Sequence, residues 1–235
     1  MDEQIDDVLN DKLLNYLLFP LIIWLLAGIE WFLQIRNAPR IPGTFAVVAA
    51  ILTVYGAIRI GQLRRQINLL KQGRDGERFV GQYLERLRLG GAQVFHDVPG
   101  DGFNLDHVVI APQGIFVVET KTWSKRRPRA RITVRAGTLF KDGYKVDPNP
   151  IEQAVAESAW LSRLLVESTG KSLSVRGVVL FPGWFVEPMD GATKNKAWVL
   201  EPKAFPAFLD HEPTRLAESD VTLAAFHLTR YVRTT

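Results

Sequence analysis

The sequence predicts an α/β protein in which a mixed sheet is flanked by helices and preceded by a two-helix transmembrane hairpin. Two long apolar runs occupy the N-terminal quarter of the 235-residue chain, and short β-branched runs alternate with helical patterns in the remainder. That alternation is typical of a sheet covered by helices. The chain has no cysteine, which excludes a disulfide framework and thiolate metal sites.

The charge of the chain is unevenly distributed. Its net charge is +4, but residues 1–12 hold five acidic residues and one lysine, so residues 13–235 carry +8. Such an excess suits a polyanionic partner or an anionic membrane surface, and the charge alone does not choose between them.

We expect the first transmembrane helix at Leu13–Leu33, a run of 21 residues whose only ionisable side chain is Glu30. About 20 apolar residues span the hydrocarbon core of a bilayer. Tyr16 and Trp31 lie near the ends, where interfacial aromatic residues are common, and Pro20 favours a kink. A cleaved signal peptide is an alternative, but the N-terminal flank is acidic and no small-residue cleavage site follows.

The second expected helix, Gly43–Ile58, has 16 uncharged residues and spans a bilayer if it pairs with the first helix or meets a thin membrane. A buried helical hairpin of a soluble protein is the other alternative. The connecting loop contributes Arg36 and Arg40. The opposite side contributes six basic residues, namely Lys12, Arg59, Arg64, Arg65, Lys71 and Arg74. The positive-inside rule therefore predicts a multi-pass inner-membrane protein whose C-terminal domain is cytoplasmic.

The elements that follow fit the predicted fold class. Gln62–Gln72 is expected to form a juxtamembrane helix that Gly73 and Gly76 interrupt, and a second helix is expected from Asp75 to Leu89. Strands are expected at Gln93–Asp97, Ile132–Arg135, Thr138–Phe140, Ser174–Phe181 and Ala197–Leu200. Further helices are expected at Asn149–Glu167, where Asn149 fits an N-cap and Pro150 the first position, at 202–209 and at 214–232.

The most informative segment is an antiparallel hairpin at Asp106–Lys121, in which two β-branched runs flank a Pro-Gln-Gly turn. If the first two turn residues form the loop, Asp106 faces Glu119. Directly opposed Cβ atoms are about 4.5–5.5 Å apart, and Lys121 shares the face of Glu119 because side chains alternate along a strand. Two acids and a lysine in apolar strands predict a metal-dependent site, although strand-end caps or a solvated ion pair would also place charges here.

The paired carboxylates also indicate the chemistry. They are hard oxygen ligands that suit Mg²⁺ or Mn²⁺, and a cation held by them polarises a phosphodiester and activates water. Lys121 can orient that water or stabilise the developing negative charge. The four histidines, His96, His107, His211 and His227, are dispersed in the sequence. No GxxxxGK[ST] or GxSxG motif is present, which argues against P-loop nucleotide hydrolysis and serine esterase chemistry.

Five motifs in order carry a resemblance to a known family: Gly76-Glu77, Leu105–Val109, Gly114–Lys121, Asn149–Gln153 and Val178–Phe181. Together they resemble the nuclease-related domain, NERD, over about residues 73–210. Asp106 followed by Glu119-Thr120-Lys121 is similar to the D…(D/E)xK core of the PD-(D/E)xK nuclease superfamily. Leu105 stands where the superfamily name has a proline.

The resemblance implies a restriction-endonuclease-like core that processes DNA with Mg²⁺ (or Mn²⁺). It implies that Asp106, Glu119 and the Thr120 carbonyl bind the metal. It also implies that Lys121 activates the attacking water.

Two further residues enter the site through the resemblance. Glu77 would add an acid from the preceding helix, although a first-turn acid also favours the helix dipole. Gln153 would support the site from the helix after the hairpin, although it could simply complete the polar bonding of that helix N-terminus.

A basic segment after the hairpin is a candidate nucleic-acid-binding surface, and it contains Lys125, Arg126, Arg127, Arg129 and Arg131. The same charges could form a solvated face or attract a membrane surface. Trp123, just before them, could stack on a base or pack against the core.

The predicted organisation is an acidic tail with two transmembrane helices at 1–61, a linker at 62–72, a NERD-like domain at 73–210 and a C-terminal helix packing on it at 211–235. The predicted function is that of a membrane-anchored, metal-dependent nuclease, with DNA favoured over RNA as substrate. Two alternatives stay open: a catalytically silent nucleic-acid-binding scaffold, and an interaction module whose basic face docks on anionic lipid.

Overall fold

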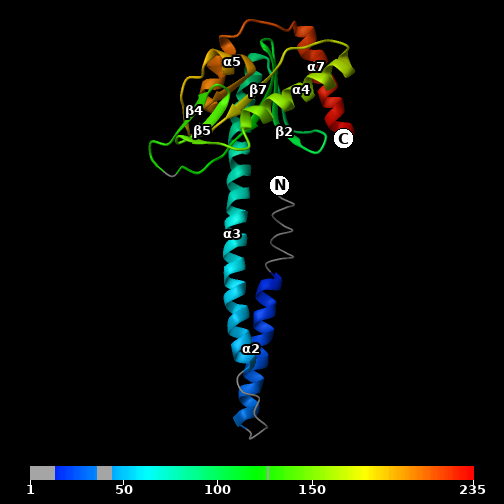
Figure 1. Ribbon diagram of the computed structural model, residues 1–235. Coiled ribbons are helices and arrows are strands. Elements are labelled where there is room, and N and C mark those ends of the chain that lie inside the picture. The colour runs from blue at the N-terminus through cyan, green and yellow to red at the C-terminus, as the bar shows by residue number, and fades with distance from the viewer. Residues whose placement is uncertain (1–13, 36–43, 126) are drawn as a thin grey trace. The chain divides into compact units, whose positions relative to one another are not determined.

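The computed structural model describes residues 14–35, 44–125 and 127–235 (Figure 1). The chain divides into two compact units, with the boundary between Arg74 and Asp75. The expected acidic tail, the loop between the two apolar runs and Arg126 lie outside the described residues.

In the N-terminal unit, helix α2 (Leu14–Ile35) packs against the first part of helix α3 (Thr44–Leu84). A Cβ on Gly56 would lie 3.1 Å from the Tyr16 carbonyl oxygen, so glycine lets the two helices approach closely. Trp24 Nε1 donates to Thr53 Oγ1 at 2.8 Å. The pairing of the two apolar runs therefore agrees with the expected helical hairpin.

The structure supports membrane crossing by these helices only weakly. Among the described residues, one helix, Ala46–Gly90, is long and apolar enough to cross a bilayer by length and composition, and the apolar part of α2, Tyr16–Phe32, is shorter. The membrane hairpin stays a prediction.

The predicted helix break at Gly73 and Gly76 is wrong, because α3 runs without interruption to Leu84. A single glycine costs a helix only about 1 kcal/mol relative to alanine, which neighbouring turns can offset. Gly76 serves close packing instead, since a Cβ there would lie 1.8 Å from Thr122 Oγ1. After α3 comes a 3₁₀ turn, η2 (Glu85–Gly90), which ends at Gly91 with φ of 85°.

The main sheet of the C-terminal unit is mixed, with strand order β1-β2-β3-β7-β9. Strands β1, β2 and β3 pair antiparallel, whereas β3, β7 and β9 pair parallel. The bounds are β1 Gln93–Pro99, β2 Asn104–Ala111, β3 Gly114–Thr120, β7 Val175–Leu180 and β9 Ala197–Leu200. Every residue of the central strand β3 is buried, as its apolar run predicts.

Helices cover both faces of this sheet (Figure 1). Helix α4 (Pro150–Thr169) packs on β3 and β7, and α7 (Glu218–Thr234) contacts α4, β1 and β2. The opposite face packs against the end of α3 and against α6 (Phe205–Asp210), which follows the 3₁₀ turn η3 (Pro202–Ala204). The last helix begins at Glu218 and not at the expected residue 214.

A second sheet, of order β6-β5-β4-β8, was not expected as a separate layer. Its strands are β4 Arg131–Arg135, β5 Thr138–Lys141, β6 Tyr144–Lys145 and β8 Phe185–Val186, and a short helix, α5 (Gly191–Lys196), follows. Two-residue strands such as β6 and β8 are too short for an alternating pattern to be detected. The predicted α/β class is therefore confirmed, with two mixed sheets in place of one.

Candidate functional site

The register of the β2–β3 hairpin agrees with the prediction. Ala111 pairs with Gly114 and His107 pairs with Val118, so the next position brings Asp106 level with Glu119. The Thr120 backbone N–H donates to Asp106 Oδ2 at 2.7 Å, which holds this carboxylate against the end of β3. The two predicted acids therefore meet at the C-terminal end of the central strand.

Lys121 completes this group. Its ammonium donates to Glu119 Oε1 at 2.5 Å and to Gln153 Oε1 at 3.0 Å, so it joins the hairpin to helix α4. The Lys121 backbone N–H donates to the Leu180 carbonyl at 2.9 Å, which continues the parallel pairing of β3 and β7 past the last strand residue. The backbone beneath the lysine is therefore fixed by the sheet.

Helix α4 can reach these residues because of a glycine in β7. A Cβ on Gly177 would lie 2.6 Å from the Ala154 carbonyl oxygen, a distance that real Cβ atoms do not show. Gly177 pairs with Val117, two residues before Glu119 on β3. The missing side chain lets α4 press onto the sheet next to the carboxylates, and so brings Gln153 to Lys121.

Glu157 is a site residue that the sequence reasoning missed. It lies one turn beyond Gln153, whose Nε2 donates to Glu157 Oε1 at 2.8 Å. The residue is 5% exposed, and its Oε2 finds no hydrogen-bond partner among the described residues.

The signal for Glu157 was the position of the buried stripe on α4. The apolar residues Val155 and Ala159 do not belong to that stripe, because both are exposed. The buried positions include Ala154, Leu161 and Leu165, and Glu157 falls on that line at helical spacing.

Three carboxyl groups in and near this cluster have raised pKa values. Burial and the charge of Glu119 together raise the pKa of Asp106 to about 8, and the same two causes raise the pKa of Glu157 to about 7. Burial also raises the pKa of Glu77, with smaller contributions from Asp97 and Glu119. Several acids that disfavour each other's charge, gathered at one strand end, are typical of a functional site.

Glu77 was expected to enter the site from the preceding helix. It follows Gly76, whose contact with Thr122 brings this part of α3 close to the segment after β3. Its side chain is half-buried, and the charge of Glu119 affects its pKa. Among the described residues, the Glu77 carboxylate makes no hydrogen bond to the other five predicted catalytic and metal residues, so it affects the site through its charge.

The donor set fits a divalent cation in part. Asp106, Glu119 and Glu157 offer oxygen ligands, and Mg²⁺ commonly uses one or two carboxylates together with waters and substrate phosphates. Among the described residues, however, no group of three or more histidine or acidic side chains is arranged to hold a metal ion. Lys121 already compensates Glu119 at 2.5 Å. The arrangement therefore fits an ion that one or two carboxylates and solvent bind, and not a closed protein cage.

The described residues of the predicted basic segment differ in their contacts. Arg131 forms an ion pair with Glu187 at 2.8 Å, whereas Arg127 and Arg129 are exposed. The Lys125 ammonium lies 5.6 Å from the centre of the Trp184 ring.

The structure also pairs two histidines that looked dispersed. His96 and His107 are register partners in β1 and β2, and their Nδ1 atoms are 2.8 Å apart. His96 Nε2 lies 2.8 Å from Glu85 Oε1. The His107 side chain is on the face of the sheet opposite Asp106, as alternation along β2 requires.

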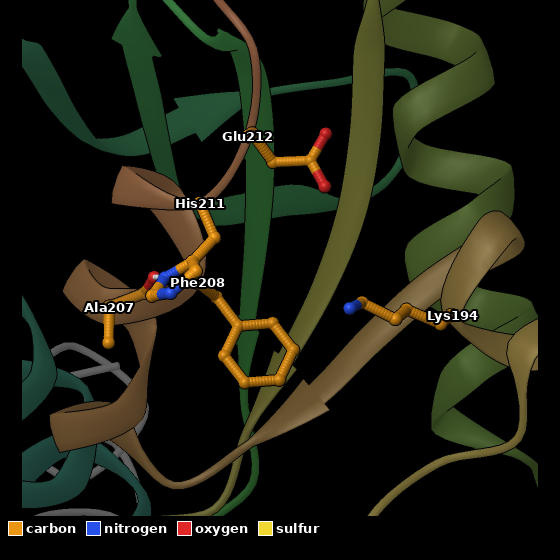
Figure 2. Close-up of a pocket in the computed structure, with 5 residues that line it drawn as sticks. All are labelled: Lys194, Ala207, Phe208, His211 and Glu212. Atoms are coloured by element: carbon orange, nitrogen blue, oxygen red, sulfur yellow. Dashed lines mark hydrogen bonds between the residues drawn. The ribbon is translucent and has the colours of Figure 1, made fainter.

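A cavity of about 310 Å³ is lined by Lys194, Ala207, Phe208, His211 and Glu212 (Figure 2). The Lys194 ammonium lies 5.2 Å from the centre of the Phe208 ring. Phe208 packs on the core of the sheet face opposite the carboxylates, so this cavity is separate from the predicted site.

Comparison with known proteins supports the resemblance. The model of the nuclease-related domain, NERD, matches residues 72–182, so a nuclease-related domain is found there, consistent with the PD-(D/E)xK superfamily. The match includes all the carboxylate–lysine residues described above, whereas residues 183–210 lie beyond it.

An uncharacterized protein of Bacillus anthracis is 40% identical over 57 residues, which is 22% of this chain. The aligned part spans 27% of the length of that relative. No solved structure matches the chain.

Proposed function

We propose that this chain is a membrane-anchored, metal-dependent nuclease that hydrolyses DNA phosphodiester bonds. The observation that carries the proposal is the bonded group at the end of β3, where Lys121 joins Glu119 to Gln153 beside the partly buried Asp106. This group lies inside the range that matches the nuclease-related domain. A domain of that kind supports a nuclease-related function and binding to nucleic acid.

Asp106, Glu119 and the Thr120 carbonyl would hold Mg²⁺ or Mn²⁺, which would supply Lewis-acid polarisation of the phosphodiester and a more acidic bound water. The protein's own residues would do the positioning. Lys121, held by Gln153 on its other side, would orient the attacking water and stabilise negative charge that develops on the phosphate oxygens.

The two apolar helices would anchor this domain at the cytoplasmic face of the inner membrane. The support is the close pairing of α2 and α3, together with the excess of basic residues on the side of the chain that leads into the C-terminal unit. Alkaline extraction of membranes checks this part of the proposal: the full chain stays in the membrane fraction, and release by carbonate would contradict the anchor.

The catalytic part of the proposal is tested with the full chain in detergent, on plasmid, linear and branched DNA with Mg²⁺ or Mn²⁺. We expect Asp106→Ala and Glu119→Ala each to lower the cleavage rate by about 100-fold or more. Glu167→Ala, which removes an exposed acid at the far end of α4, is the matched control and keeps the wild-type rate. Equal cleavage by the wild type and both site variants on every substrate would refute the catalytic role.

A catalytically silent scaffold that binds nucleic acid is the second candidate. The ion pair of Lys121 with Glu119 favours it, because it occupies an oxygen that a metal would need. Salt-sensitive binding with no metal-dependent cleavage on any substrate would select the scaffold.

A further inference from the structure

Two lysines and two aromatic side chains lie just beyond the candidate site, and the lysine ammonium groups lie against tryptophan rings. Four side chains make up this surface, here called the cation–aromatic track: Trp123, Lys125, Lys141 and Tyr144. Trp123 is two residues past Lys121, so the track begins at the same end of β3 as the carboxylates. Its remaining members come from the basic segment and from the second sheet.

The track has a fixed frame. The Lys141 ammonium lies 5.0 Å from the centre of the Trp123 ring and 5.4 Å from that of the Trp184 ring. Trp184 is 2% exposed and donates from Nε1 to the Trp123 carbonyl at 3.0 Å. Trp123 packs on Phe181 at 4.9 Å between ring centres. The rings of Trp123 and Trp184 therefore hold the Lys141 ammonium in place.

Tyr144 extends the track outward. It is the register partner of Lys141 in the β5–β6 hairpin, so the two side chains share a face. The Tyr144 side chain is 76% exposed, which is high for an aromatic residue in a strand. Exposed Arg127 and Arg129 of the preceding segment add positive charge near Lys125. The surface thus offers a ring to a flat apolar partner and cations to an anionic one.

We propose that the cation–aromatic track binds a single strand of nucleic acid and leads it to the carboxylates. An unpaired base can stack its flat face on an aromatic side chain. In a duplex, neighbouring bases cover that face. The lysines would hold the phosphates between the stacked bases, since a cation near the backbone releases counterions. This proposal rests on the proposed function, because the bound strand is led to the proposed nuclease site. It names the substrate of that site as single-stranded nucleic acid.

The test measures binding apart from cleavage. The full chain in detergent is titrated, in EDTA, against a fluorescein-labelled single strand and against a duplex of the same length, with fluorescence anisotropy as the readout. We expect tighter binding of the single strand, and Tyr144→Ala raises its Kd by at least about fivefold. Lys141→Gln lowers the slope of log Kd against log salt by about 0.7, the value for one lost phosphate contact to a single strand.

The second sheet provides matched controls. Phe185→Ala removes an aromatic side chain that is 64% exposed, and Lys145→Gln removes a charge beside Tyr144 that points to the other face of the hairpin. Both controls keep the wild-type Kd and salt slope. Equal effects of Tyr144→Ala and Phe185→Ala would overturn the track, and so would duplex binding at least as tight as single-strand binding. Binding to anionic vesicles but not to nucleic acid would also overturn it.

The outcomes also separate the track from the nuclease. Single-strand binding that depends on Tyr144, without any cleavage, would keep the track and remove the catalytic proposal. Metal-dependent cleavage of duplex DNA with no effect of Tyr144→Ala would do the reverse.

Discussion

Two polar groups lie on opposite faces of strand β2, one around Asp106 and one around His107, and they differ in how they carry charge. On the face toward α4, Asp106 lies beside Glu119 and Lys121. On the face toward α3, His107 pairs with His96, which contacts Glu85. Asp106 and His107 are neighbours in sequence, so the difference comes from what packs on each face.

The histidine group avoids buried charge. Burial, helped by the neighbouring His96, lowers the pKa of His107 to about 4, so this ring is neutral near pH 7. The His96 ring, on the neighbouring strand β1, is the polar partner of the His107 ring. The contact between the two Nδ1 atoms gives one polar atom of the neutral His107 ring a partner, which lowers the cost of burying it, while His107 Nε2 has no hydrogen-bond partner among the described residues.

The carboxylate group concentrates acids that disfavour each other's charge. The pKa values of Asp106 and Glu157 are raised to about 8 and about 7. Natural proteins retain such unfavourable arrangements mainly at functional sites. The raised pKa values favour the carboxylate face of β2 as the place of the proposed function, and three experiments test this difference between the two faces.

The largest expected contrast is in cleavage. Lys121→Met removes the ammonium that contacts Glu119 and Gln153, and we expect the rate of DNA cleavage to fall by about 100-fold or more. His96→Ala breaks the histidine pair and leaves the rate unchanged, because that pair lies on the other face of the sheet. Initial rates of DNA cleavage with Mg²⁺, measured on folded full-length variants, test this difference. A similar loss in both would show that the two faces act together.

The next contrast compares two glycines that allow close packing. Gly177→Ala places a Cβ against the Ala154 backbone, and we expect a loss of stability of about 1–3 kcal/mol together with reduced cleavage. Gly81→Ala meets the two histidine rings at 3.3 Å and 3.4 Å, which can shift slightly, and alanine favours the helix by up to about 1 kcal/mol. Denaturant unfolding should therefore show little change for Gly81→Ala. An unchanged stability in Gly177→Ala would mean that α4 does not depend on this contact.

The smallest expected contrast is in the pH dependence of stability. The pKa of Asp106 is raised from 3.8 in the unfolded chain to about 8 in the folded one, so its contribution to stability is lost as pH rises across that window. The pKa of His107 is lowered from 6.5 to about 4, so its contribution is lost as pH falls across that window. The two faces therefore respond to pH with opposite sign.

Asp106→Asn keeps an oxygen that can accept from the Thr120 N–H and removes the buried charge. In EDTA we expect it to raise the Tm above that of the wild type by at least about 2 °C at pH 8, with the difference shrinking toward pH 4. His107→Asn keeps a polar group toward His96 and removes the loss of stability between pH 6.5 and pH 4. Thermal unfolding followed by circular dichroism measures both, and a Tm difference for Asp106→Asn that is independent of pH would contradict the raised pKa.

Local sequence signals predicted the parts of the site that depend on neighbouring residues. The turn after Ala111 set the hairpin register, since a two-residue loop leaves one pairing. Asn149 caps α4 by accepting from the Ile151 N–H at 3.2 Å, as Asn followed by Pro predicted. These features were correct because each involves residues a few positions apart.

The features that sequence reasoning missed all depend on distant packing. Gly76 was read as a helix breaker, but it faces Thr122 from 46 positions away in the chain. The His96–His107 pair required the β1–β2 register, and the second sheet required two-residue strands to find partners. None of these has a signal in local composition.

The sequence by itself determined the α/β class, the acid–acid–lysine hairpin and the resemblance to a nuclease-related domain. Periodicity, turn chemistry and short motifs encode these properties locally. Tertiary structure alone decided that Gly177 admits α4, that Gln153 thereby reaches Lys121, and that Glu157 joins the carboxylates. The reason is physical: a buried charge acquires its role from the groups that desolvate and bond it, and here those groups come from a helix that starts 29 residues after Lys121.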